Sequence, residues 1–495
     1  MELLKPTFTK IICSLFLIMM FTNSCSQIES KATENISTKT QKIDKLIKTY
    51  ADYGQFNGTI LVAENGVILY KKAFGLANME WDIPNNTNTK FRLASVTKQF
   101  TSMLILQLVA EGKLDLHKPI STYLKDYPKP QADKITIHHL LTHTSGIPNY
   151  TSFPNYWNLM RNPISSSDLV KNFADSTLKF TPGERFNYSN SGYVLLGNII
   201  ETVTKKNYAE ILQEKIFSPL GMKESDYYNS TNIIKHEASG YFLSGSSYKK
   251  ANYIDISVSY AAGGIYSTVE DLYRWDQALY TEKLLPKKYL DSMFLPYQPI
   301  GRSYYAYGWN IAKAPIGNTG EKIDVIEHDG VINGFSSLIL RIPSSKSTII
   351  ILNNTSGAPI NHMAKGIIGI LYNKTYDLPI QSTARVLAEK IKIEGLSNGL
   401  VFFNEIKDSP DYYINENEMN LLGYEFFENR DFETAKAIFE LNIKAFPNSF
   451  NVYDSYGEVL IELGDLEAAI TNYKKSLELN PKNNNAKEKL KELVK

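Results

Sequence analysis

One motif constrains this chain more than any other feature: Ser95-Val96-Thr97-Lys98 stands immediately before a long apolar stretch. Residues 99–111 carry apolar side chains on most sides, which predicts a buried helix that ends at Gly112. Three-residue spacing places Ser95 and Lys98 on one helical face, close enough to meet. The N–H groups at the start of such a helix favour developing negative charge.

This pair of side chains predicts acyl-transfer chemistry. A serine hydroxyl is a weak nucleophile until a neighbouring group accepts its proton. A lysine amine can accept that proton where its surroundings keep it neutral. Ser95 is therefore the candidate nucleophile and Lys98 its candidate activator. Because Ser-x-x-Lys also occurs by chance in long chains, the prediction needs a further proton carrier, a substrate contact and an oxyanion site.

A second segment supplies two of these groups. Residues 186–190 follow a Pro182-Gly183 turn and include Tyr188 and Asn190. In an extended segment these two side chains point to the same face. A phenol can relay protons and an amide can hold a carbonyl group, so Tyr188 is a candidate catalytic residue and Asn190 a candidate substrate contact.

A third segment, His328-Asp329-Gly330-Val331, follows an apolar run that resembles a strand. A glycine such as Gly330 allows another backbone or a ligand to approach closely. The Val331 N–H would then lie beside the Ser95 N–H and form an oxyanion hole with it. His328 is a candidate substrate contact, either neutral or cationic.

The order and spacing of Ser95-x-x-Lys98, Tyr188-x-Asn190 and His328-x-Gly330 resemble those of the penicillin-recognising serine hydrolases. Within that family the chain is most similar to the class C β-lactamase-related group, which includes D-peptidases and esterases. Residues 140–146 and 261–275 add to a resemblance that covers about residues 45 to 375.

The resemblance implies a role for each candidate residue. Ser95 would be acylated, Lys98 and Tyr188 would share the proton transfers, Asn190 would contact substrate, and the Ser95 and Val331 N–H groups would bind the oxyanion. Many members have Lys-Thr-Gly where this chain has His328-Asp329-Gly330. A permanent cation is thereby replaced by a group whose ordinary pKa is about 6.5.

The expected substrate is therefore a small ester, amide or D-peptide at least as readily as a β-lactam. No cofactor is expected. No metal is expected either, because the three histidines His138, His139 and His143 lack the acidic partner of a zinc motif. The alternative function is a non-catalytic protein that recognises penicillin or a cell-wall fragment and recruits a partner through its C-terminal region.

The arrangement of β-rich segments predicts the fold of residues 43–375. A hairpin is expected over 58–63 and 67–72, because Asn65-Gly66 lies between two β-rich runs. Helices are then expected at residues 195–204 and 208–217, and another through residue 279 after a capping box at 267–270. Strands are expected again at 323–327, 334–342 and 348–352, followed by a final helix at 360–372. We therefore expect an α+β fold, an α/β/α sandwich with an antiparallel sheet and a helical insertion.

The C-terminal region repeats with a period of 34 residues, as Gly423 and Gly457 illustrate. The same spacing relates four more pairs: Asp431 and Asp465, Ala435 and Ala469, Phe439 and Tyr473, and Pro447 and Pro481. The pattern resembles tetratricopeptide repeats, which are helical pairs, and predicts two of them over residues 416–495. Residues 376–415 are expected to be a helical linker or a degenerate repeat. The repeats either bind a protein partner or only extend the domain.

The N-terminus resembles an export signal. Positive charge at Lys5 and Lys10 precedes an apolar run at 11–21 that is too short to span a bilayer. Cys25 follows, as at a bacterial lipoprotein processing site, so residues 1–25 predict export and a lipid anchor on Cys25. An ordinary signal peptide cleaved nearby is the alternative. Either reading places the protein in the periplasm or at the cell surface, with lipidation anchoring it to a bacterial membrane.

Residues 26–42 are polar and are expected to be a linker. The whole chain has 53 basic and 52 acidic residues, a net charge of +1 that gives no indication of nucleic-acid binding.

Overall fold

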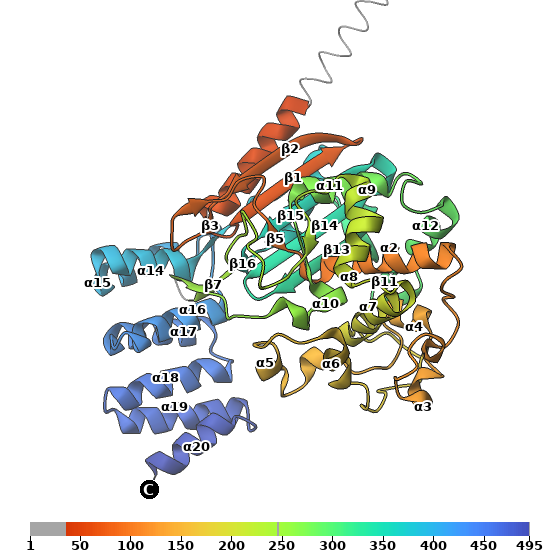
Figure 1. Cartoon of the computed structure of the whole chain (residues 1–495). Helices are drawn as coiled ribbons and strands as arrows, with labels where there is room; N and C mark the ends of the chain where they lie inside the picture. Colours follow the sequence, from red (N-terminus) through yellow and green to blue (C-terminus); the bar gives the residue numbers. More distant parts are fainter. Residues whose placement is uncertain (1–35, 245–246, 495) are drawn as a thin grey trace, which may run out of the picture.

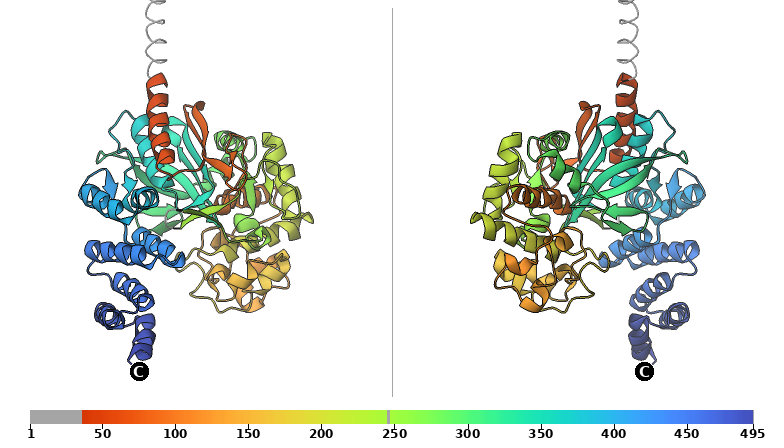
Figure 2. Two further views of the ribbon diagram at one scale, coloured as in Figure 1. Left: turned by 90° about the vertical axis from the view of Figure 1, so that its left-hand side faces the viewer. Right: turned by 90° about the vertical axis from the view of Figure 1, so that its right-hand side faces the viewer.

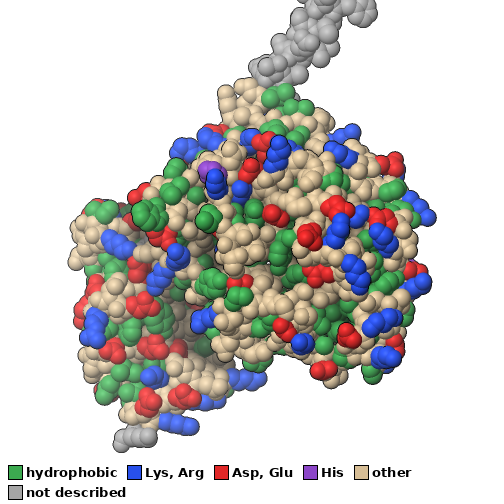
Figure 3. All heavy atoms as spheres, viewed as in Figure 1, with side chains coloured by type: hydrophobic (Ala, Val, Ile, Leu, Met, Phe, Trp, Pro, Cys, Tyr) green, Lys and Arg blue, Asp and Glu red, His purple; other side chains and the backbone are tan. Residues whose placement is uncertain are grey.

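The computed structural model describes residues 36–244 and 247–494 (Figure 1). A sandwich of helices around a sheet forms the larger part, and a column of helices follows it to the C-terminus. On the face drawn in Figure 3, basic and acidic side chains are interspersed, and a hollow separates the lower helices of the column from the sandwich. Residues 1–25, including Cys25, lie outside the described residues. Within the described residues, no helix has the length and apolar character needed to cross a bilayer.

An eight-stranded antiparallel sheet forms the centre of the sandwich. Its spatial order is β10-β11-β12-β13-β14-β15-β1-β2, so the N-terminal hairpin lies beside strands from far along the chain. This confirms the prediction of one sheet built from both ends. The strands are β1 (Gly58–Glu64), β2 (Val67–Phe74), β10 (Gln298–Ile300), β11 (Ser303–Tyr305), β12 (Asn310–Pro315), β13 (Lys322–Ile332), β14 (Phe335–Ile342) and β15 (Ser347–Asn353).

The hairpin between β1 and β2 turns at Asn65 and Gly66, as the sequence predicts. Both residues have positive φ, 52° and 71°, which is the backbone that a two-residue turn between antiparallel strands requires. Asparagine and glycine tolerate this conformation better than other residues, so the turn sets the pairing of the two strands.

The two faces of the sheet bury two separate sets of side chains, because successive residues of a strand point to opposite sides. On one face, Ile60 and Ile351 pack with the helix over 36–52 and with α13 (Ile360–Leu371). On the other face, neighbouring positions such as Leu61 pack towards α2 (Thr97–Ala110) and α11 (Val269–Ala278). Figure 2 shows helices on both sides of the sheet, which confirms the α/β/α sandwich.

The helix over 36–52 corrects the predicted linker. The chain is already helical at residue 36, although residues 26–42 were expected to form a flexible tether. Lys39 is buried and pairs with Glu64 of β1 at 2.8 Å, and Ile43 is fully buried beneath the sheet. Polar composition predicts a tether, but packing against the sheet stabilises a helix here.

The helical insertion lies between β2 and β10. Its helices are η1 (Ala94–Val96), α2, η2 (Ile120–Thr122), α3 (Lys129–Ala132), α4 (Ile137–Leu141), η3 (Tyr150–Ser152), α5 (Tyr156–Leu159), α6 (Ser166–Lys171), α7 (Asn190–Thr204), α8 (Tyr208–Leu212), η4 (Gln213–Phe217), α9 (Ser218–Leu220), η5 (Ile256–Val258), α10 (Tyr260–Gly263), α11 and α12 (Lys287–Met293); η6 (Pro343–Ser345) follows between β14 and β15. Two predictions are corrected: α7 begins at Asn190 rather than at residue 195, and the helix predicted over 208–217 changes to a π-helical turn after Leu212.

Short strands join these helices to the sandwich and to the column. They are β3 (Leu76–Asn78) with β4 (Ile83–Pro84), β5 (Phe91–Arg92) with β9 (Ile265–Ser267) and β6 (Asp226–Tyr227), β16 (Thr355–Ser356) with β7 (Tyr241–Ser244) and β8 (Ser247–Lys250), and β17 (Gln381–Ser382) with β18 (Tyr412–Tyr413).

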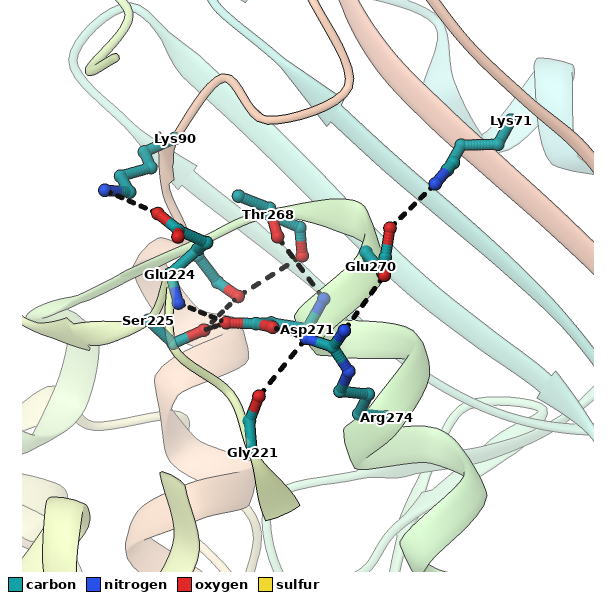
Figure 4. Close-up of polar contacts among 10 residues, drawn as sticks. Lys71, Lys90, Gly221, Glu224, Ser225, Thr268, Glu270, Asp271 and Arg274 are labelled. Atoms are coloured by element: carbon teal, nitrogen blue, oxygen red, sulfur yellow. Dashed lines mark hydrogen bonds and ion pairs between the residues drawn. The ribbon is translucent and has the colours of Figure 1, made fainter. Parts of the chain in front are cut away.

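The start of α11 differs from the predicted capping box by one residue (Figure 4). Thr268, rather than Ser267, is the N-cap, and its hydroxyl accepts the Asp271 N–H at 3.3 Å. Glu270 instead pairs with Lys71 of β2 at 2.7 Å and with Arg274 at 2.9 Å. The acidic side chain that the sequence assigned to the cap therefore ties α11 to the sheet.

The helices of the column explain the 34-residue period. They are α14 (Thr383–Glu394), α15 (Leu396–Ile406), α16 (Glu416–Glu428), α17 (Phe432–Ala445), α18 (Phe450–Glu462), α19 (Leu466–Leu479) and α20 (Asn484–Leu493). A Cβ added to Gly423 would lie 2.4 Å from the Phe439 ring, and one on Gly457 would lie 2.9 Å from the Tyr473 ring. Each repeat thus needs glycine where its two helices cross over an aromatic ring.

A buried ion pair joins α11 to the sheet. Arg341 of β14 donates from Nε to Asp276 Oδ1 at 2.6 Å, and both side chains are at most 2% exposed. The guanidinium also lies over the Tyr280 ring, 4.5 Å from its centroid. Removing one partner of a buried pair leaves the other charge uncompensated, which costs more than the pair itself contributes.

Asp276→Asn is expected to lower the free energy of unfolding by about 3–5 kcal/mol, because Arg341 stays buried without its carboxylate. Asp324→Asn is the matched control, since Asp324 forms an exposed pair with Lys313 and should change stability by less than about 1 kcal/mol. Urea unfolding followed by circular dichroism measures both. Equal losses in the two variants would contradict this account of the buried pair.

Candidate active site

The predicted nucleophile lies at the start of the buried helix, as the sequence indicates. Ser95 is in the short η1, which continues directly into α2. The preceding Ala94 has φ 48°, a left-handed backbone that costs a non-glycine residue roughly 1–3 kcal/mol. Nearly all of α2 is buried, so the helix holds Ser95 against a rigid support.

Lys98 is fully buried one turn after Ser95, and its Nζ lies 3.0 Å from Ser95 Oγ. The same nitrogen lies 2.8 Å from Asn190 Oδ1 and 2.8 Å from the carbonyl oxygen of Ala262 in α10. Burial lowers the pKa of Lys98 well below its usual value, although the nearby Asp329 carboxylate opposes the shift. Desolvation therefore shifts Lys98 towards its neutral form.

A neutral amine has two N–H groups and one lone pair. The oxygens of Asn190 and Ala262 can only accept hydrogen bonds, so they take the two N–H groups of Lys98. The lone pair then faces Ser95 Oγ. This arrangement allows Lys98 to accept the hydroxyl proton of Ser95, which is the chemistry that the Ser-x-x-Lys motif predicts.

Tyr188 reaches the same hydroxyl from the other side, with its Oη 2.9 Å from Ser95 Oγ. Burial raises the pKa of Tyr188 well above its ordinary value, so the phenol keeps its proton and donates to Ser95. Ser95 Oγ thus accepts a hydrogen bond from Tyr188, and its own proton can pass to Lys98 Nζ when that amine is neutral. The geometry suits Lys98 as the base and Tyr188 as a proton donor.

Asn190 lies beside these groups but on a different element from the one expected. It is the first residue of α7 and not part of an extended run, because Ser189 is the N-cap of that helix. Its side chain reaches both the Ser95 cavity and Lys98. Asn190 therefore orients the lysine as well as facing the site where substrate would bind.

His328 lies behind the site, and it is not among the residues that line the Ser95 cavity. Its ring is buried, with Nε2 3.0 Å from the Tyr305 hydroxyl and Nδ1 2.6 Å from the Asp329 carbonyl oxygen. Burial and the nearby Lys98 lower the pKa of His328 to about 4. The residue is thus neutral near pH 7 and packs against Tyr305.

Two aromatic neighbours of Tyr188 are not among the site residues that the sequence predicts. The His143 ring lies 4.2 Å from the Tyr188 ring, and its Nδ1 accepts the Ser189 N–H at 3.2 Å. Burial keeps the pKa of His143 well below its usual value. Tyr305 packs on His143 at 4.6 Å between ring centroids. The family resemblance covers residues 140–146 and so includes His143. No sequence motif marks Tyr305, which is one of many tyrosines in this chain.

Gly330 brings β13 against the turn that carries Ser95. A Cβ at this position would lie 2.2 Å from the Leu93 carbonyl oxygen and 3.0 Å from the Ser95 nitrogen. Ser337 of the neighbouring strand donates to the same Leu93 oxygen at 2.7 Å. The Ser95 N–H is in the first turn of a helix, where N–H groups lack intrahelical acceptors. Val331 lines the same cavity as Ser95, in keeping with the predicted oxyanion hole.

The cavity at Ser95 has a volume of about 190 Å³. Its lining carries no charged side chain among the described residues: Ala94, Ser95, Tyr150, Thr151, Tyr156, Asn190, Ile254, Ser259, Ala262, Gly263, Val331, Ile332 and Asn333. Hydroxyl, amide and apolar groups therefore form the walls of the site.

Comparison with known proteins agrees with this geometry. Residues 43–368 match the sequence model of a family described as Beta-lactamase. The chain belongs to this family. Residues 457–490 match the TPR repeat, which confirms that the C-terminal region contains a repeat of this family.

Several members are clearly similar to this chain. It is 34% identical to Penicillin-binding protein 4* of Bacillus subtilis, over 69% of this chain and 78% of that protein. The crystal structure of a penicillin binding protein from Bacillus halodurans superposes with a TM-score of 0.58 at 31% identity, covering 64% of this chain and 97% of the other. D-amino acid amidase from Ochrobactrum anthropi gives 0.59 at 25% identity, covering 68% and 99%. The sandwich is thus a serine hydrolase domain of the β-lactamase and penicillin-binding protein type.

Gly330→Ala is expected to lower the rate of acylation by about 10²–10³-fold, because the added methyl group forces β13 away from Ser95 and misplaces an oxyanion donor. Gly320→Ala is the control, since a Cβ there meets nothing within 4 Å. Single-turnover hydrolysis of p-nitrophenyl acetate measures both. A Gly330→Ala variant as fast as Gly320→Ala would contradict the predicted oxyanion hole.

The pH dependence of kcat/KM is expected to report Lys98. The base works only when neutral, so kcat/KM should fall as pH falls through the lowered pKa of Lys98 and should level off above it. Tyr188→Phe should reduce kcat/KM by about 10²–10⁴-fold and keep the same acid limb. If the acid limb disappears in Tyr188→Phe, the titrating base is the phenol and not the amine.

Proposed function

We propose that this protein hydrolyses small, neutral ester or amide substrates through an acyl-enzyme on Ser95. The observation that carries the proposal is the 3.0 Å contact between Ser95 Oγ and the buried Lys98 Nζ, whose other two partners only accept hydrogen bonds. A poised nucleophile and its base are thus held together before substrate arrives.

The steps follow from this arrangement. Lys98 takes the Ser95 proton while Oγ attacks the substrate carbonyl carbon, and the Ser95 and Val331 N–H groups stabilise the oxyanion. Tyr188 gives its proton to the departing alcohol or amine and regains one from the Lys98 ammonium. A water molecule then attacks the acyl-enzyme as the same groups move protons in reverse, which releases the acid and restores Ser95.

The uncharged cavity supports neutral substrates. Many family members have a lysine where this chain has His328, and here the imidazole is buried, neutral and bonded to Tyr305. A carboxylate on a β-lactam or on a peptide end would meet no cation among the described residues that line the cavity. The similarity to D-amino acid amidase supports amides as well as esters.

The helical column supports a second role beside hydrolysis. Its match to the TPR repeat supports binding of a protein partner. The pattern of residues 1–25 supports export and a lipid anchor on Cys25, which would hold the enzyme on a bacterial membrane, in the periplasm or at the cell surface. Export and anchoring rest on that sequence pattern alone.

Labelling with a fluorescent phosphonate should place one adduct on the Ser95 peptide, which mass spectrometry detects. Ser95→Ala should remove both this adduct and ester turnover. The melting temperature of the variant should equal that of the wild type. Ser145→Ala is the control, because Ser145 is a buried hydroxyl that does not line the Ser95 cavity. Turnover at the wild-type rate in Ser95→Ala would overturn the proposal. A fluorescent penicillin that stays bound to Ser95, with no ester or amide turned over, would favour the recognition protein.

A further inference from the structure

A second cavity, of about 960 Å³, lies where the catalytic sandwich meets the helical column. Its walls come from the helix over 36–52, from α13, from β8 and from α14, and it shares no lining residue with the cavity at Ser95. The volume falls in the range of about 300–1,000 Å³ that is usual for small-molecule sites. The catalytic mechanism uses none of these residues.

Direct contacts hold the walls of this cavity in place. Arg385 of α14 donates from Nη1 to the Tyr53 carbonyl oxygen at 2.5 Å and from Nη2 to the Tyr248 hydroxyl at 3.3 Å. Tyr248 of β8 in turn donates to the Gly54 carbonyl oxygen at 2.9 Å. Three segments that are distant in sequence therefore meet at Arg385, so the cavity is formed before any ligand binds.

The lining includes two hydrogen-bond donors, the Tyr50 hydroxyl and the Lys365 ammonium group. Tyr50 is only 5% exposed, yet its hydroxyl has no hydrogen-bond partner among the described residues. Lys365 forms no ion pair within the described part of the chain. Tyr50 lines the cavity, so its hydroxyl can donate a hydrogen bond to a ligand there.

The two carboxylates in the lining are already engaged. Asp377 accepts a hydrogen bond from Asn318 Nδ2 at 2.6 Å. Glu418 accepts one from the Tyr413 hydroxyl at 2.9 Å and another from Ser382. These donors are uncharged, so they do not neutralise the carboxylates. Burial and the nearby Asp377 carboxylate raise the pKa of Tyr50 to about 12, so its hydroxyl keeps its proton as a donor, and Lys365 supplies a positive charge for an acid group.

Lys365 and Tyr50 lie on neighbouring helices that pack closely. A Cβ added to Gly366 would come within 2.8 Å of Leu46, which is one helical turn before Tyr50. Beyond these donors, the lining includes Leu378 and Ile380, which are 40% and 42% exposed. The cavity thus combines a donor end with an apolar wall.

We infer that this cavity binds a small organic acid, with its anionic group at Lys365 and the Tyr50 hydroxyl and its apolar body against Leu378 and Ile380. A charge-assisted hydrogen bond from Lys365 holds the acid group, and the apolar wall removes the rest of the ligand from water.

Fluorescence titration of the purified full chain with 8-anilinonaphthalene-1-sulfonate tests this site, because the probe is an apolar aromatic body with one anionic group. We expect saturable binding of one equivalent. Lys365→Met should weaken binding about tenfold, the effect of losing one charge-assisted hydrogen bond. Lys374→Met is the matched control, since Lys374 pairs with Glu321 outside the cavity, and it should leave affinity unchanged.

N-phenyl-1-naphthylamine, the same aromatic body without the sulfonate, separates charge recognition from apolar binding. It should bind more weakly, with no dependence on Lys365. Tyr50→Phe keeps the ring and should weaken only the sulfonate probe. Melting curves confirm that each variant is folded.

Three results would overturn the inference. The first is that the sulfonate probe binds Lys365→Met as tightly as it binds the wild type. The second is that the neutral probe binds with the same affinity as the sulfonate probe. The third is that acylation of Ser95 by a phosphonate displaces the sulfonate probe. The last result would place the probe in the catalytic cavity. None of these readouts depends on hydrolysis, so they test the second cavity separately from the proposed catalysis.

Discussion

The complete burial of Lys98 is the constraint on which the rest of the site depends. In water this amine would carry a charge and could not act as a base near neutral pH. Inside the sandwich, desolvation lowers its pKa, and Asn190 and Ala262 satisfy its N–H groups. The cost of burying a polar group is thereby offset by hydrogen bonds. The same partners orient the remaining lone pair towards Ser95.

That burial requires the whole sandwich. α2 is covered on nearly every side, and the sheet beneath it closes only because β1 from the N-terminal end pairs with β15 from the far end. Gly330 then lets β13 approach the Ser95 turn, and His143 and Tyr305 hold Tyr188 from behind. A small change at any of these contacts would alter the distances at Ser95, because packed interiors transmit displacement.

Much of this organisation follows local rules and could be predicted. Asn65-Gly66 specifies a two-residue turn, and Gly423 and Gly457 mark helix crossings at a 34-residue period. Other features depend on contacts between distant segments, which one sequence does not reveal. Residues 36–42 look like a tether by composition, yet Lys39 pairs with Glu64 and the helix forms. The N-cap of α11 is Thr268 rather than Ser267, and Glu270 pairs with Lys71 on the sheet instead of completing a capping box.

By itself the sequence determined which side chains could react. Ser95 and Lys98 are one helical turn apart, and helix geometry places their side chains next to each other. It also determined the α/β/α class, through strand periodicity at both ends of the domain. Only the tertiary structure decided that Lys98 favours its neutral form, that His328 lies behind the cavity, and that a second cavity forms beside α14. These properties depend on desolvation and on shape, which arise only when segments far apart in the chain exclude water together.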